Sequence, residues 1–140
     1  MEENLRRLFS EQMTEEKAGN YSPLVLAFLG DAVFELYIRS ILVREGNARP
    51  KNLNRRKAEL VKASSQSALV ARLEPLLTER EAEIYRRGRN AKAQSTAKHA
   101  SVSDYRRATG FEALIGYLFL TGQTERILEL MEKGINNESD

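Results

Sequence analysis

The sequence predicts an all-α domain. Apolar residues recur with the period of a helix along nearly the whole chain, and no stretch combines apolar–polar alternation with β-branched residues. The 140 residues are 41% hydrophobic and 30% charged, which is enough to build one domain with its own core. We expect a single domain over residues 1–140, with an N-terminal helix in about residues 1–20 and a polar tail at about residues 135–140.

Residues that start and end helices divide the N-terminal half of the chain into three predicted helices. Ser22 offers an N-cap, and Pro23 occupies the first helical position after it. Gly19 and Gly46 mark two helix ends, and Pro75 ends the third helix. The expected helices cover about residues 3–18, 23–45 and 52–72.

In the C-terminal half, Thr78 and Glu81 have the spacing of a capping box, which predicts a short helix through Arg87. We expect Gly88 to begin a long polar connection that ends at Ser103, the predicted cap of the next helix. Connections of this length in compact domains are usually functional or disordered. The last two expected helices cover about residues 104–121 and 124–134.

The chain contains no cysteine, which excludes disulfides, thiolate metal sites and cysteine nucleophiles and suits a reducing compartment. No signal peptide is evident at the N-terminus, so we expect a cytoplasmic protein. The longest apolar stretch, Leu24 to Val43, contains Asp31, Glu35 and Arg39, which would be costly in lipid. We interpret it as a buried core helix and expect no membrane partner.

The net charge is only +2, but the basic residues are clustered. Residues 49–62 hold six basic residues and one acid, and residues 84–107 hold seven basic residues and one acid. Such clusters are typical of a protein that binds a polyanion, although a basic run can also be a solvated face. The composition therefore favours a nucleic-acid partner without establishing one.

Two apolar helices each carry an acid, Asp31 and Glu112. An ionised carboxylate among packed hydrocarbon is unfavourable by several kcal/mol unless it is paired, hydrogen-bonded or bound to a cation. Asp31 has no basic residue three or four positions away, so pairing within its own helix does not account for it. Glu35 differs, because Arg39 follows one turn later, and we interpret these two as an ion pair.

Glycines next to both acids predict how the helices meet. Gly30 precedes Asp31, and Gly116 follows Glu112 by one turn, so two backbones could approach closely there. If the helices cross at these glycines, the two carboxylates converge on a site that suits Mg²⁺, with Mn²⁺ as a substitute. A metal there could activate a water molecule and hold a phosphate oxygen, and the basic segments could dock a phosphodiester backbone. The pattern predicts a nuclease.

At these residues the sequence resembles the ribonuclease III catalytic domain, whose motifs read LGDAV and EALIG. The matching segments are Phe28–Val33 (FLGDAV) and Glu112–Gly116 (EALIG), with Leu60–Ala63 (LVKA) between them. Arg87–Lys92 (RGRNAK) and Phe111–Leu120 (FEALIGYLFL) resemble the mini-ribonuclease III branch, which lacks the double-stranded-RNA-binding domain. The resemblance implies a helical endonuclease fold.

The chain departs from the four-acid pattern of that family. The two further acids would stand where this sequence has Ala27 and Thr109. By resemblance, Asp31 and Glu112 are the catalytic and metal-binding residues, and Thr109 could orient a metal-bound water. Fewer carboxylates should weaken Mg²⁺ binding in the free protein and leave waters and RNA phosphates to complete the shell.

The resemblance also implies a homodimer, formed through the helix of Asp31, that cuts both strands of duplex RNA and leaves 5′-phosphate and 3′-hydroxyl ends. The expected substrate is precursor 23S ribosomal RNA, and the sequence leaves open whether a large-subunit ribosomal protein presents it. The segment from Lys92 to Ser103 is a candidate for insertion into the RNA groove. The expected RNA-binding residues are Arg55, Arg56, Lys57, Arg86, Arg87, Arg89, Lys92, Lys98, Arg106 and Arg107.

Two other classes of function stay open at this point. A catalytically inactive protein of the same fold would bind RNA or the ribosome without cleaving, and a helical protein-interaction module would have no RNA role. The presence of both Asp31 and Glu112 argues against the first of these. Incubation with duplex RNA and Mg²⁺ discriminates between all three.

Overall fold

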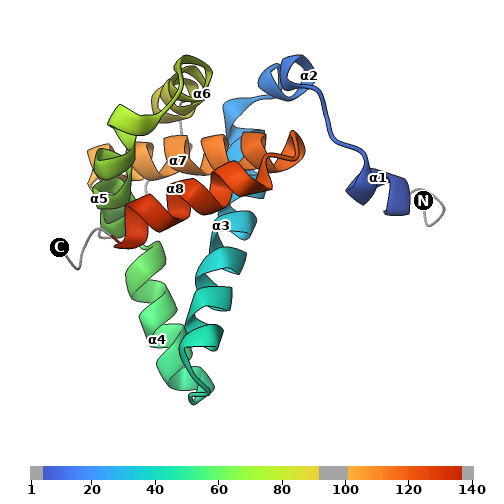
Figure 1. The fold of residues 1–140 in the computed structure, drawn as a ribbon. Coiled ribbons are helices and arrows are strands. Elements are labelled where there is room, and N and C mark those ends of the chain that lie inside the picture. Colours follow the sequence, from blue (N-terminus) through green and yellow to red (C-terminus); the bar gives the residue numbers. More distant parts are fainter. Residues whose placement is uncertain (1–4, 92–100, 137–140) are drawn as a thin grey trace.

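The computed structural model describes residues 5–91 and 101–136, which form helices joined by short connections (Figure 1). No strand occurs within these two ranges, so the predicted all-α fold class is confirmed. The elements are α1 (Leu5–Ser10), α2 (Glu15–Gly19), α3 (Pro23–Glu45), α4 (Pro50–Val61), α5 (Ala63–Leu73), the 3-10 helix η2 (Glu74–Leu76), α6 (Glu79–Asn90), α7 (Val102–Leu120) and α8 (Thr124–Asn136).

The helix α7 lies at the centre of the fold, in contact with α2, α3, α5, α6 and α8. Its side chains Ala113, Ile115 and Leu118 have no exposed surface. The ring of Phe111 meets that of Phe34 on α3 edge to face, with the ring centroids 5.2 Å apart. Burial of these apolar and aromatic surfaces holds α3 against α7.

The helix α3 begins and ends as expected, and it is a core helix of the protein. It buries Leu26, Phe34, Ile38 and Leu42. Its C-terminal part and α4 extend away from the other helices as an arm (Figure 1). None of the helices described has the length and apolar content required to cross a membrane.

The expected N-terminal helix over residues 3–18 is wrong, because α1 and α2 are separate short helices. Between them the N–H of Met13 donates to the carbonyl of Leu120 at 2.8 Å. The side chain of Thr14 then accepts from the N–H of Lys17 and starts α2. A contact with the end of α7 therefore replaces the hydrogen bonds of a continuous helix.

The expected helix over residues 52–72 is also divided into two, α4 and α5. Lys62 adopts an extended conformation (φ −64°, ψ 156°) between them. The carbonyl of Val61 accepts from Gln66 Nε2 at 2.8 Å, and that of Glu59 accepts from Ser65 Oγ at 2.6 Å. These side chains supply the donors that α4 loses at its end.

The predicted capping box of α6 is present, because Thr78 Oγ1 accepts from the N–H of Glu81 while the Glu81 carboxylate accepts from the N–H of Thr78. However, α6 continues past Gly88 to Asn90. Gly88 lies inside α6, where the helix packs closely on α7. A Cβ at Gly88 would stand 2.9 Å from the Cα of Gly110 on α7, which explains the glycine at this position. The following helix begins earlier than expected, with Ser101 as its cap instead of Ser103.

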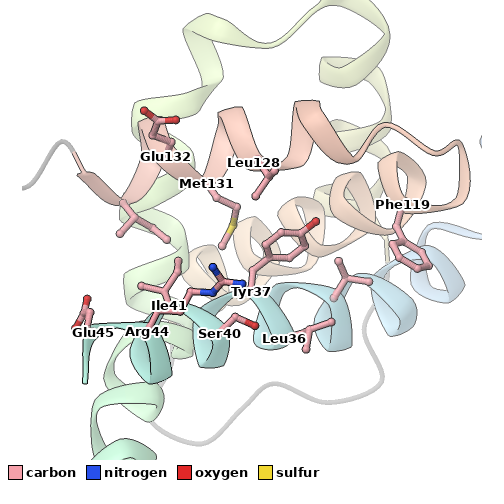
Figure 2. Close-up of a pocket in the computed structure, with 12 residues that line it drawn as sticks. Leu36, Tyr37, Ser40, Ile41, Arg44, Glu45, Phe119, Leu128, Met131 and Glu132 are labelled. Carbon is pink, nitrogen blue, oxygen red and sulfur yellow. The ribbon is translucent and has the colours of Figure 1, made fainter. Parts of the chain in front are cut away.

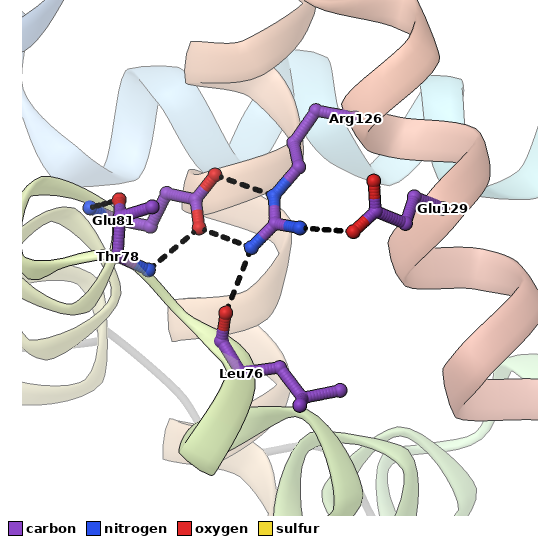
Figure 3. A network of polar contacts seen from close by, with 5 residues as sticks. All are labelled: Leu76, Thr78, Glu81, Arg126 and Glu129. Atoms are coloured by element: carbon purple, nitrogen blue, oxygen red, sulfur yellow. Dashed lines mark hydrogen bonds and ion pairs between the residues drawn. The ribbon is translucent and has the colours of Figure 1, made fainter.

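A buried ion pair joins α6 to α8 (Figure 3). Arg126 donates to both carboxylate oxygens of Glu81, at 2.9 and 2.8 Å, and also to the carbonyl of Leu76. Burial opposes ionisation of Glu81, but Arg126 and Thr78 hold the pKa of that carboxyl below its usual value. Glu81 thus caps α6 and fixes α8 at the same time.

Candidate active site at the crossing of two helices

The two acid-bearing helices cross at the predicted glycines. A Cβ atom on Gly30 of α3 would overlap the carbonyl oxygen of Glu112 on α7. A Cβ atom on Gly116 of α7 would likewise overlap the carbonyl oxygen of Leu26 on α3. Only residues without a side chain permit this approach, so the glycines set the distance between the two backbones.

The crossing brings Asp31 and Glu112 together, with Asp31 exposed and Glu112 partly buried. Burial and the neighbouring Asp31 carboxyl raise the pKa of Glu112 to about 8, although the Gln66 side chain acts in the opposite direction. No cationic side chain among the described residues contributes to this balance. The site is therefore short of positive charge when both carboxyls are ionised.

This shortage fits a divalent cation held between Asp31 and Glu112, because a cation would stabilise both carboxylates in ionised form. The described parts of the chain contain no group of three or more His, Cys, Asp or Glu side chains suited to a metal. The protein would thus supply two carboxylates, and water and substrate would supply the remaining ligands.

Both positions where the resemblance leads one to expect further acids are buried. Ala27 is 7% exposed and Thr109 is 8% exposed. Thr109 Oγ1 donates to the carbonyl of Tyr105 at 3.0 Å. Its hydroxyl proton is therefore used within α7, and the oxygen can still accept a hydrogen bond from a water.

Glu35 lies one turn beyond Asp31 on α3 but belongs to a different environment. It forms the expected ion pair with Arg39, at 2.6 Å, and a second one with Lys57 of α4, at 3.2 Å. The hydrogen bond from Arg39, with a further contribution from Lys57, holds the pKa of Glu35 low against the effect of burial. This acid connects α3 to α4 and already has its positive partners.

The expected RNA-binding residues lie on three helices, and several also make intramolecular contacts. On α4, Lys57 pairs with Glu35, Arg56 pairs with Glu45 at 2.6 Å, and Arg55 donates to Asn52. These contacts leave the arm basic along an exposed surface. Lys92 and Lys98, together with most of the segment from Lys92 to Ser103, lie outside the described residues.

On α6 and α7 the arginines divide into two groups. Arg87 donates to the carbonyls of Gly19 and Tyr21, and Arg107 donates to Ser67 Oγ at 3.4 Å. Arg89 lies over the ring of Tyr85. Within residues 5–91 and 101–136, Arg86 and Arg106 are exposed and form no hydrogen bond or ion pair. These two guanidinium groups can reach a ligand without breaking a contact of the fold.

Comparisons with known proteins show the family to which the chain belongs. A family model described as the ribonuclease III domain matches residues 24–123, which include both acids and both glycines of the crossing. The chain belongs to the ribonuclease III family. The chain is 46% identical over 126 residues to the Mini-ribonuclease 3 of Thermoanaerobacter sp. (strain X514), with 90% of this chain and 89% of the relative covered. It is 40% identical over 134 residues to that of Clostridium tetani, with 94% and 89% covered.

The fold is also found in a solved structure. A crystal structure of a Fusobacterium nucleatum protein is similar, with a TM-score of 0.77 and 34% sequence identity over 85% of this chain and 95% of that one. These matches assign the chain to the mini-ribonuclease III branch of the ribonuclease III family. The family relationship indicates an endoribonuclease.

In this ribonuclease III domain, sequence reasoning missed Gln66. The residue is 3% exposed and lies beside Glu112, where its amide influences the pKa of the carboxyl. A glutamine between two serines gives no sign of burial in the sequence. Only the break at Lys62, which turns α5 toward α7, brings Gln66 to the site.

Proposed function

We propose that the chain is a metal-dependent endoribonuclease of the cytoplasm that hydrolyses double-stranded RNA in the maturation of precursor 23S ribosomal RNA. The observation that carries the proposal is the convergence of Asp31 and Glu112 at the glycine crossing, with the pKa of Glu112 raised to about 8. A carboxyl pair without a cationic partner is a costly arrangement unless it has a ligand. The family relationship supports the same reaction class.

Asp31 and Glu112 would hold Mg²⁺, or Mn²⁺ in its place. When bound, the ion supplies Lewis-acid stabilisation of a phosphate oxygen and lowers the pKa of a water. Asp31 is exposed and would face the approaching substrate, while Glu112 lies deeper in the protein. Hydrolysis of a phosphodiester at this site would leave a 5′-phosphate and a 3′-hydroxyl.

Basic side chains on three helices would dock the phosphates of the duplex. Arg86 and Arg106 are exposed and have no intramolecular partner among the described residues, and α4 adds further positive charge. Phosphate and 2′-hydroxyl contacts across the minor groove recognise the A-form duplex by shape. This arrangement favours a double-stranded substrate, which a large-subunit ribosomal protein could help to present.

A homodimer would give each strand of the duplex its own site. The helix α3 exposes large apolar side chains, among them Phe28 at 82% and Leu36 at 62%. Leu36 also lines a pocket of about 860 Å³ between α3, α7 and α8, together with Tyr37, Phe119 and Leu128 among others (Figure 2). Exposed apolar surface of this kind favours a protein partner, and we propose a second copy of the chain.

The proposal is tested by incubating the purified protein with perfectly paired RNA and Mg²⁺. The wild-type protein should cleave both strands, while Asp31→Asn and Glu112→Gln should bind the RNA and leave it intact. Glu125→Gln, which alters an exposed acid on α8, is the matched control and should cleave normally. Binding without cleavage by the wild-type protein would instead identify an inactive RNA-binding protein, and absence of salt-dependent binding would identify a protein-interaction module.

A further inference from the structure

We infer that Gln66 is a positioning residue for Glu112 and contributes to the affinity of the site for a divalent cation. The inference rests on the proposed metal site and adds a side chain to it that the two acidic motifs do not contain. Three observations carry it: the burial of Gln66, the fixed orientation of its amide and an acceptor atom that has no partner.

The orientation of the Gln66 amide is determined by its surroundings. Gln66 is 3% exposed on α5, and its Nε2 donates to the carbonyl of Val61 at 2.8 Å. A carbonyl can only accept, so the amide atom that faces Val61 must be the nitrogen. The side chain is thus held at the junction of α4 and α5.

The same amide acts on Glu112 across the contact between α5 and α7. Its contact with Glu112 would help to hold the carboxylate in place for a cation. One side chain thus contacts both the carbonyl of Val61 and Glu112. Gln66 thereby links the position of Glu112 to the end of α4.

The other atom of the amide is unsatisfied. Gln66 Oε1 is buried and has no hydrogen-bond partner within the described residues. A buried acceptor without a donor is unfavourable, because it has lost its hydrogen bonds to water. Because Oε1 belongs to the amide beside Glu112, a water held near the two carboxylates when a cation is bound would be a suitable donor for it. Mutation of a side chain that contacts a metal ligand commonly lowers the affinity for the metal by about 10- to 100-fold.

Ser65 provides a matched control for a purely structural role. Like Gln66, it caps a carbonyl at the end of α4, because Ser65 Oγ donates to Glu59 at 2.6 Å. However, Ser65 is not among the groups that act on Glu112. Removing either side chain should lower the stability of the junction, but only the loss of Gln66 should change metal binding.

The test is calorimetric titration of the RNA-free protein with Mn²⁺. Gln66→Met keeps the length of the side chain and removes the amide, and it should weaken Mn²⁺ binding about tenfold or more. Gln66→Asn keeps an amide that is too short to reach both partners, and it should also lose affinity. Ser65→Ala should bind Mn²⁺ like the wild type even if its melting temperature falls. In cleavage assays, raising the Mn²⁺ concentration should restore most of the kcat of Gln66→Met without changing KM for RNA.

Wild-type Mn²⁺ affinity in both Gln66 variants, with affinity lost in Asp31→Asn, would overturn the inference and leave the proposed function standing. If Asp31→Asn and Glu112→Gln also bind Mn²⁺ with wild-type affinity, the proposed metal site itself is wrong. An equal loss of Mn²⁺ affinity in Ser65→Ala and Gln66→Met would also overturn the inference. The loss would then come from a disturbed junction of α4 and α5 and not from the Gln66 amide.

Discussion

A side chain on Gly30 would overlap the main-chain carbonyl oxygen of Glu112. The residue before Asp31, one of the two proposed catalytic acids, therefore controls how closely the backbone of the other approaches. We expect Gly30→Ala to force α3 and α7 apart and to destabilise the protein by about 3 kcal/mol or more. Gly46→Ala is the control, since a Cβ there meets nothing within 4 Å, and its stability should stay close to wild type. Urea unfolding followed by circular dichroism measures both.

The stability of the metal-free protein should depend on the ionisation of Glu112. In the folded protein the pKa of this carboxyl is about 8, against 4.5 for an unperturbed glutamate. Between these values the folded state binds more protons than the unfolded state, so the free energy of unfolding should fall as the pH rises from about 4.5 to 8.

Glu112→Gln removes this titration and should be more stable than the wild type at pH 8 in the presence of a chelator, by about 1–3 kcal/mol. The difference between the two proteins should shrink as the pH is lowered toward 5. Thermal unfolding across this range measures it. A constant difference at every pH would contradict the raised pKa of Glu112.

The contact between Arg126 and Glu81 should matter for stability and not for chemistry. Arg126→Met leaves the Glu81 carboxylate, which is 6% exposed, without its cation, and we expect a loss of about 2–4 kcal/mol. Glu129→Gln removes the more exposed partner of Arg126 and should cost under 1 kcal/mol. Mn²⁺ affinity should be unchanged in both folded variants, as titration calorimetry can establish.

Two neighbouring arginines on α6 should behave differently when replaced. Arg86→Ala should weaken RNA binding and reduce the salt slope by about the contribution of one phosphate contact, with little change in melting temperature. Arg87→Ala should lower stability by about 2 kcal/mol, because its guanidinium group holds the carbonyls of Gly19 and Tyr21. RNA retention measured over a series of salt concentrations, together with melting curves, distinguishes the two. Equal salt slopes in Arg86→Ala and the wild type would exclude Arg86 from the RNA contact.

The proposed dimer should depend on Phe28. Phe28→Asp places a charge on the exposed apolar surface of α3 and should yield a monomer in sedimentation velocity experiments. Phe9→Asp, which changes an equally exposed phenylalanine on α1, should leave the association state unchanged. A wild-type protein that sediments as a monomer at micromolar concentration would refute the dimer directly.

Local signals predicted much of the fold. The Thr78–Glu81 box and the Ser22–Pro23 start were recognised because caps depend on residues close in sequence. The break at residues 11–14 was not, because the partner of Met13 is Leu120, far along the chain. The break at Lys62 was not either, because the bonds of Gln66 and Ser65 to the end of α4 leave no distinct pattern in the sequence. Helical periodicity continues through such breaks and does not reveal them.

The candidate site was predictable where a small residue and an acid occurred together. Gly30 and Gly116 indicated a close crossing, and the structure has α3 and α7 in contact there. The role of Arg87 in holding the α2–α3 connection was not predictable, because its partners are main-chain carbonyls far away in sequence. A basic cluster in a sequence does not distinguish guanidinium groups that support the fold from those that can reach a ligand.

The position of Asp31 and Glu112 on two different helices has a consequence for the newly made protein. The carboxylates are far apart along the chain and meet only after α7 has packed into its glycine contact with α3. A nascent polypeptide whose C-terminal half is still being made therefore has not yet assembled the candidate site. The two carboxylates would meet only when synthesis of the chain is nearly complete, so an unfinished copy would lack the site.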